Sequence, residues 1–178
     1  MSSKLKNLSV YDETTMPDAT EMTFGIVVAE WNAHITHALY EGCYDTLVKH
    51  GAKPESIETM QVPGAFELPQ GARILMGAKK MDAIICLGCV IKGETSHNEY
   101  INTAVANGLT QLGISSGRPC IFGLLTPNDE QQGIDRAGGV HGNKGIEAAQ
   151  TAIRMAALRK KNAVATKSSI GFGFHNEA

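Results

Sequence analysis

Short apolar runs alternate along the chain with segments in which apolar residues recur at helical spacing. Residues 23–29 and 82–90 form continuous, β-branched apolar runs, which are typical of parallel strands covered on both faces. The pattern predicts two further strands, over residues 57–62 and 119–125. Helices are predicted between and after the strands, at residues 35–50, 68–80, 97–112, 128–136 and 143–161.

Strand and helix alternate four times, which favours an α/β fold with a parallel sheet between two layers of helices. We therefore expect a three-layer α-β-α sandwich. In such open sheets, ligands bind beyond the carboxyl ends of the strands. The turns after the predicted strands are the places to look for a site.

The length of 178 residues fits one domain. We expect this domain at residues 23–161, with a polar N-terminal extension at 1–22 and a flexible tail at 162–178. No apolar segment follows Lys4 and Lys6, and no window approaches the ~20 apolar residues of a membrane helix. The expectation is a cytoplasmic protein without a membrane partner.

Composition narrows the class of partner. Hydrophobic residues make up 43% of the chain, which excludes a disordered protein. The formal net charge is -2, far from the basic excess that binding to phosphate backbones selects. We therefore expect no nucleic-acid partner.

The cysteines Cys86 and Cys89 are spaced as C-x-x-C, which could mark a redox pair or half of a zinc site. They lie inside the apolar run 82–90, where an odd spacing places them on opposite faces of a strand. We interpret this pair as small buried hydrophobic residues, and we expect reduced thiols at all four cysteines, Cys43 and Cys120 included.

Two residues at predicted strand ends are ambiguous when taken singly. Trp31 is the only tryptophan, and it either stacks on a flat heterocycle or covers the end of the core. Glu67 either accepts hydrogen bonds from a ligand or is an acidic residue favoured in the first turn of a helix, and by itself the second role is favoured.

The segment 93–97 predicts an anion site, because a glycine, two hydroxyls and a helix start bring free backbone N–H groups together. Ser96 and Glu99 have capping-box spacing, which places His97 in the first helical turn. A histidine there can exchange protons near neutral pH or can be a bystander. No Walker or G-x-G-x-x-G spacing is present, so nucleotide triphosphates and dinucleotides are poor candidates.

Arg136 precedes a glycine-rich stretch, 137–145, that contains His141 and Lys144. Arg136 can complement a helix C-terminus, and the glycines indicate backbone held close to a ligand or another subunit. His34 and His37 are three residues apart, but no nearby residue completes a metal set. We interpret them as surface residues and expect no metal.

Together these segments resemble the lumazine synthase family over about residues 24–158. The resemblance rests on four motifs in order: Trp31-Asn32 with Ile35-Thr36; residues 62–67, VPGAFE; residues 88–95, GCVIKGET, with His97; and Arg136-Ala137-Gly138 followed by residues 142–145, GNKG. Lys92 and Asn98 stand where the family often has an arginine and an aromatic residue.

The resemblance implies an enzyme of riboflavin biosynthesis that needs no cofactor. It would join 5-amino-6-(D-ribitylamino)uracil to 3,4-dihydroxy-2-butanone 4-phosphate, giving 6,7-dimethyl-8-ribityllumazine, phosphate and water. By resemblance, His97 moves protons, while Phe122 and Arg136 come from the neighbouring subunit. The implied substrate-binding residues are Trp31, Ala65, Phe66, Glu67, Cys89, Val90, Ile91, Glu94, Thr95, Phe122, Arg136 and Lys144.

The resemblance also implies a flavodoxin-like strand order of 2-1-3-4, in which the fourth strand is an edge, and a homo-oligomer, either a pentamer or a hollow shell of twelve pentamers. Riboflavin synthase is a candidate partner. Three rival readings remain: the related archaeal-type riboflavin synthase, a flavin-binding module in which His97 is a bystander, and a shell protein without activity.

Overall fold

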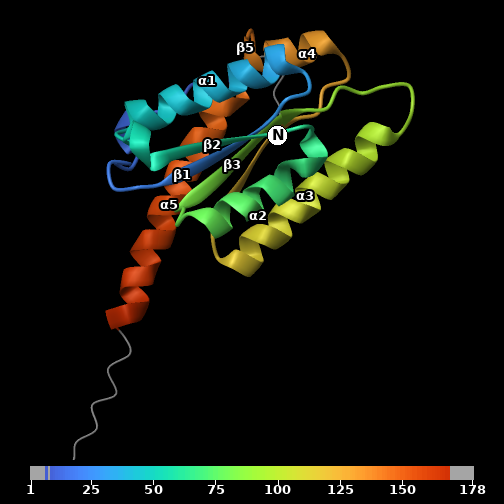
Figure 1. The fold of residues 1–178 in the computed structure, drawn as a ribbon. Coiled ribbons are helices and arrows are strands. Elements are labelled where there is room, and N and C mark those ends of the chain that lie inside the picture. Colours follow the sequence, from blue (N-terminus) through green and yellow to red (C-terminus); the bar gives the residue numbers. More distant parts are fainter. Residues whose placement is uncertain (1–6, 8, 169–178) are drawn as a thin grey trace, which may run out of the picture.

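The protein folds as the sequence predicts, into a parallel sheet between two layers of helices. In the computed structural model (Figure 1), which describes residues 7 and 9–168, the strand order is β2-β1-β3-β4. All neighbouring strands in this sheet are parallel. The strands are β1 Phe24–Ala29, β2 Ile57–Val62, β3 Ala83–Cys89 and β4 Cys120–Leu125. The predicted fold class and strand order are therefore confirmed.

The helices form the two outer layers. Helices α1 (Ala33–Lys49) and α5 (Lys144–Ser168) pack together on one face of the sheet, whereas α2 (Leu68–Ala78) and α3 (His97–Ser116) cover the other face (Figure 1). A short α4 (Glu130–Asp135) follows β4. The remaining elements are short: the 3-10 helices η1 Glu13–Thr15, η2 Pro54–Ser56 and η3 Ala65–Glu67, and a hairpin of β5 Ala137–Gly139 and β6 Gly142–Asn143.

The two central strands, β1 and β3, lie in the middle of the core, and every one of their residues is buried. Alternate residues point to opposite faces of the sheet: Ile26 packs under α1 and α5, whereas Val27 packs under α2. This explains why both strands are continuous apolar runs in the sequence. β2 is an edge strand, and only its ends, Ile57 and Val62, are buried.

Folded structure continues past both predicted bounds of the domain, residues 23 and 161. Ala19 and Met22, in the predicted polar extension, are buried against the core, and Ser9 hydrogen-bonds the backbone of Asn143. Helix α5 continues to Ser168, past its predicted end at residue 161. Of the predicted tail, residues 169–178 lie outside the described part of the chain.

Asp82 links the C-terminal half of α5 to the amino ends of the strands. Its carboxylate accepts the Thr23 backbone N–H at 2.9 Å and lies 3.0 Å from Nζ of Lys160. Burial by itself raises the pKa of this carboxyl, but these interactions outweigh burial and the pKa of Asp82 is lowered. A lowered pKa in the folded state means that the ionised carboxylate stabilises the fold above the unfolded-state pKa.

Asp82→Asn is therefore expected to destabilise the protein at pH 7 by about 1–3 kcal/mol. The difference from wild type should shrink as the pH falls through the pKa of Asp82, because the wild-type carboxylate is then also neutral. Urea unfolding at pH 7 and over a series of pH values below the unfolded-state pKa of about 3.9 measures the difference and its decline. Asp45→Asn, at an exposed position of α1, is the control; an equal effect of both variants would contradict the assignment.

Candidate active site

Four residues predicted as site residues meet at one cavity at the carboxyl ends of the strands. The cavity has a volume of about 540 Å³ and is lined by Trp31, Phe66, Glu67, His97, Tyr100, Ile101 and Ala104. Trp31 follows β1, Phe66 and Glu67 lie in η3 after β2, and His97 begins α3 after β3. The rule that places ligands at strand ends therefore located this cavity from the sequence.

The turn after β2 shapes both the aromatic and the acidic side of the cavity. Glu67 Oε2 accepts the Gly64 backbone N–H at 3.1 Å, and the backbone N–H of Trp31 donates to the Pro63 carbonyl at 3.2 Å. A Cβ at Gly64 would lie 2.9 Å from Cε3 of Trp31, so the indole needs glycine at this position. The Trp31 side chain stays 66% exposed and is available for stacking.

Glu67 keeps a hydrogen-bonding oxygen for a ligand. Its Oε2 is held by Gly64, whereas Oε1 has no hydrogen-bond partner among the described residues. The fixed oxygen orients the carboxylate, and the other can accept hydrogen bonds from hydroxyl groups. Taken alone, Glu67 is interpreted as an acidic residue in the first turn of a helix, and it does lie in the first turn of η3. Its position beside the cavity also makes it available to a ligand.

Asn32 contributes a contact that spacing did not reveal. Its backbone has φ 60°, in the left-handed region, and its Nδ2 donates to the Cys89 carbonyl at 2.9 Å. This bond joins the turn after β1 to the end of β3 and so fixes the position of the neighbouring Trp31. Asparagine is among the few residues that adopt this backbone readily, which is the only local signal for its role.

The segment after β3 continues the pairing with β4. The backbone N–H groups of Val90 and Lys92 donate to the carbonyls of Leu125 and Pro127, both at 2.9 Å. Cys89 is buried, while Val90 and Ile91 are half-buried and pack against opposite sides of the core. The side chains of Cys89, Val90 and Ile91 do not line the cavity.

The loop that carries Glu94 and Thr95 is exposed and leads directly into α3. The helix begins at His97, as predicted. The predicted capping box is wrong: Ser96 forms no side-chain cap, because its backbone (φ -72°, ψ 10°) is not in the extended conformation that an N-cap adopts. Glu99 instead donates its backbone N–H to the Ser96 carbonyl at 3.0 Å.

Three predicted site residues lie elsewhere. Phe122, 38% exposed, lies on the edge strand β4, and Arg136 and Lys144 flank the β5–β6 hairpin. None of the three lines the cavity beside Trp31 in its own chain. The Ala65 side chain is buried beneath the η3 turn.

The cysteines lie as the strand pattern predicts. Cys86 packs under α2 and α3, whereas Cys89 packs under α1. Burial raises the pKa of both thiols, that of Cys89 to about 11, so neither is a reactive thiolate at neutral pH. Within the described residues, no cluster of histidine, cysteine and carboxylate side chains could hold a metal ion. His34 is an exposed surface residue, 2.9 Å from Glu130.

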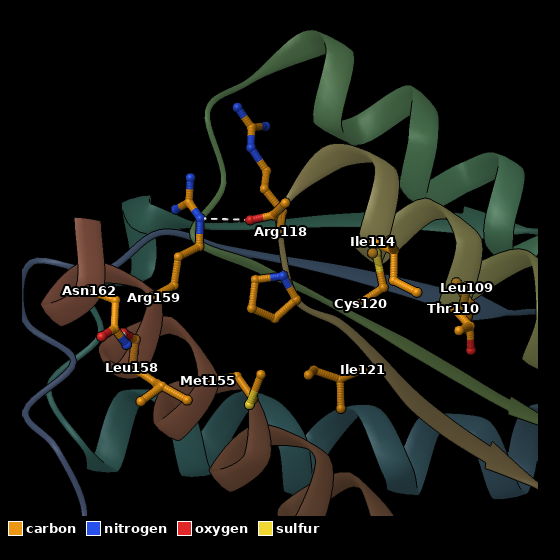
Figure 2. Close-up of a pocket in the computed structure, with 13 residues that line it drawn as sticks. Leu109, Thr110, Ile114, Arg118, Cys120, Ile121, Met155, Leu158, Arg159 and Asn162 are labelled. Carbon is orange, nitrogen blue, oxygen red and sulfur yellow. Dashed lines mark hydrogen bonds between the residues drawn. The ribbon is translucent and has the colours of Figure 1, made fainter. Parts of the chain in front are cut away.

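A second hollow, of about 490 Å³, lies at the edge of β4, between the second half of α3 and α5 (Figure 2). Its lining is mostly apolar and includes Ile114, Ile121, Met155 and Leu158, with Arg159 Nε donating to the Gly117 carbonyl at 2.9 Å. It lacks the imidazole and carboxylate of the first cavity. We therefore assign the cavity beside Trp31 as the candidate active site.

No helix in the described chain is long and apolar enough to cross a membrane.

The fold and the cavity define a flavodoxin-like α/β sandwich with a candidate ligand site at the carboxyl ends of its parallel strands. The family model of 6,7-dimethyl-8-ribityllumazine synthase matches residues 21–160. The chain therefore belongs to the 6,7-dimethyl-8-ribityllumazine synthase family, and the resemblance noted in the sequence is confirmed.

Relatives with this name cover most of the chain. The 6,7-dimethyl-8-ribityllumazine synthase of Parabacteroides distasonis is 54% identical over 155 residues, which is 87% of this chain and 97% of that protein. That of Cytophaga hutchinsonii is 52% identical over 157 residues, 88% and 98% of the two chains. That of Flavobacterium psychrophilum is 50% identical over 161 residues, 90% and 85% of the two chains.

Proposed function

We propose that the protein is the riboflavin-biosynthesis enzyme that condenses 5-amino-6-(D-ribitylamino)uracil with 3,4-dihydroxy-2-butanone 4-phosphate. The products are 6,7-dimethyl-8-ribityllumazine, inorganic phosphate and water. The family match supports the reaction. The observation that carries it is the single cavity in which Trp31, Phe66, Glu67 and His97 meet, because it combines a stacking surface, a hydrogen-bond acceptor and a proton carrier.

The aminouracil occupies the cavity beside Trp31. The exposed indole stacks on the pyrimidine, and Ala65, Phe66 and Glu67 form the ribityl side, with the free Glu67 oxygen accepting from hydroxyl groups. The backbone of Cys89, Val90 and Ile91 faces the uracil edge. The bond from Asn32 to the Cys89 carbonyl supports this arrangement by holding both segments together.

Glu94 and Thr95 hold the phosphate-bearing substrate, through their backbone and the threonine hydroxyl, at the start of α3. The aromatic amine attacks the ketone to form a Schiff base with loss of water. Elimination of phosphate leaves an enol, which tautomerises to a new carbonyl at the carbon that carried the 3-hydroxyl. The ribitylamino nitrogen then closes the ring on this carbonyl with loss of a second water. His97 moves protons in these steps. Orientation of two substrates contributes much of the rate, up to about 7–11 kcal/mol in ideal geometry.

The active site is completed by a neighbouring subunit. Phe122, Arg136 and Lys144 do not line the cavity of their own chain, and all three belong to the edge strand β4 or to the elements after it. A head-to-tail ring places this edge against the cavity of the next subunit. The exposed apolar hollow at the same edge (Figure 2) supports such a contact.

The finer assignments follow from the family resemblance. The ring is a cytoplasmic homopentamer, and twelve pentamers in a hollow shell are the alternative assembly. Riboflavin synthase is the candidate protein partner. Sedimentation of the purified protein distinguishes the assemblies, because a pentamer and a sixty-subunit particle differ twelvefold in mass.

Inorganic phosphate is expected to compete with the butanone phosphate at Thr95 and Arg136, because the proposed shared site brings backbone N–H groups, a hydroxyl and a guanidinium to one anion. Arg136→Ala should raise the inhibition constant of phosphate at least about tenfold, the loss of one charge-assisted hydrogen bond. Steady-state kinetics with both substrates measure this constant. If phosphate does not compete in the wild-type enzyme, the anion site has been assigned wrongly.

An assay with both substrates, followed by the absorbance of the lumazine, tests the proposed function. Formation of lumazine separates this reading from a flavin-binding module and from an inactive shell protein. Incubation with the lumazine alone is the second arm, because conversion of the lumazine to riboflavin would favour the archaeal-type riboflavin synthase. No lumazine formation by the folded, assembled protein would overturn the proposal.

A further inference from the structure

One carboxylate, that of Glu147, holds both cations of the loop that joins α4 to α5. Its Oε1 lies 2.8 Å from Nη2 of Arg136, and its Oε2 lies 3.2 Å from Nζ of Lys144. The side chains of Arg136 and Glu147 are 20% and 16% exposed, so water and salt screen this pair less than a surface pair. From sequence alone, Glu147 is one more acidic residue in the first turn of a helix.

The loop fixes the other side of the same guanidinium. Nη1 of Arg136 donates to the His141 carbonyl at 2.7 Å. The loop is folded back by backbone bonds of 2.9 Å from the His141 N–H to the Asp135 carbonyl and from the Lys144 N–H to the Arg136 carbonyl. A guanidinium has five N–H donors on a rigid plane, and these contacts occupy two of them, on different nitrogens.

We infer that Glu147 is a positioning residue for Arg136: it fixes the guanidinium plane so that the remaining donors are ready for the phosphate of the substrate. The inference rests on the proposed function, which assigns phosphate binding to Arg136. A free arginine side chain loses much rotamer freedom when it binds an anion, and a side chain held in place loses less. The shared carboxylate keeps Lys144 beside the same ligand.

Charge and orientation make opposite predictions for the loss of this carboxylate. The negative charge of Glu147 repels phosphate, so Coulomb's law alone predicts tighter phosphate binding by Glu147→Gln. Loss of orientation predicts weaker binding, because bidentate recognition of an anion depends on the geometry of the guanidinium. With the pair mostly buried and held on both sides, orientation dominates.

Glu147→Gln is therefore expected to raise the inhibition constant of inorganic phosphate and the KM for the butanone phosphate by roughly three- to thirtyfold. The KM for the aminouracil and kcat should change less than about twofold, because the variant leaves the stacking surface of Trp31 and the imidazole of His97 unaltered. Glu147→Asp, which keeps the charge on a shorter side chain, should fall between wild type and Glu147→Gln. In an Arg136→Ala background, Glu147→Gln should cause no further loss.

Glu130→Gln is the matched control, since it removes one carboxylate from α4 at a site that pairs with His34 and not with Arg136. An unchanged or lower phosphate constant in Glu147→Gln, with a raised constant in Arg136→Ala, overturns the positioning role alone. An unchanged constant in Arg136→Ala overturns the proposed phosphate site and this inference with it. If Glu147→Gln does not fold, Glu147→Asp decides, because a wild-type phosphate constant in that variant overturns the role.

Discussion

Replacing His97 by alanine is expected to lower kcat by roughly ten- to a thousand-fold, with KM for both substrates nearly unchanged. His97 lies at the first position of α3 and lines the cavity together with Trp31 and Glu67. In the proposed function the other residues of the cavity orient the substrates, so we expect the variant to lose proton transfer while binding remains. Steady-state kinetics with each substrate varied in turn separate the two effects.

Two further variants sharpen this prediction. His97→Asn keeps a hydrogen-bonding side chain but cannot carry the proton, so it should be as slow as His97→Ala. His37→Ala removes an imidazole from a separate hollow between α1 and β2 and should leave kcat unchanged. A His97→Ala enzyme with wild-type kcat would remove His97 from the mechanism, and an equal rise in both KM values would make it a binding residue.

The sequence predicted those parts of the fold that depend on local pattern. β1 and β3 are continuous apolar runs because they are buried on both faces. The end of α5 was predicted too early, because residues 162–168 lack an apolar stripe. The preceding turn of this helix is anchored by polar contacts that no periodicity reveals: Lys160 reaches Asp82 and also donates to the Glu21 carbonyl.

The sequence predicted those residues of the candidate site that directly follow a strand. It did not predict contacts between side chains that come from distant segments. Trp31, Glu67 and His97 each follow a strand, so topology alone brings them to one edge of the sheet. The bond from Asn32 to Cys89 depends on one left-handed residue. The ion pair between Glu147 and Arg136 forms because the β5–β6 hairpin between α4 and α5 brings Arg136 next to the first turn of α5.

The proposed sharing of the site can be tested by mixing two variants that are each poorly active. His97 faces the cavity formed by the first three strand ends, whereas Arg136 lies beyond the edge strand β4. We expect His97→Ala and Arg136→Ala each to retain only a small fraction of the wild-type activity when the butanone phosphate is kept below its wild-type KM. When the two chains are co-expressed and mix at random, about a quarter of the shared sites should draw both wild-type residues, one from each subunit.

Activity of the mixture therefore decides between a shared site and a site within one chain. In a head-to-tail ring, each cavity receives Arg136 from the next subunit, so a mixed ring contains intact sites even though no single chain is intact. The double variant His97→Ala/Arg136→Ala, co-expressed with wild type, is the control, since it too leaves about a quarter of the sites intact if the site is shared and a half if it is not. Native mass spectrometry confirms that the chains have mixed. If a mixed assembly of the two single variants is as inactive as its parents, His97 and Arg136 act within the same chain, and the edge of β4 does not complete a neighbouring site.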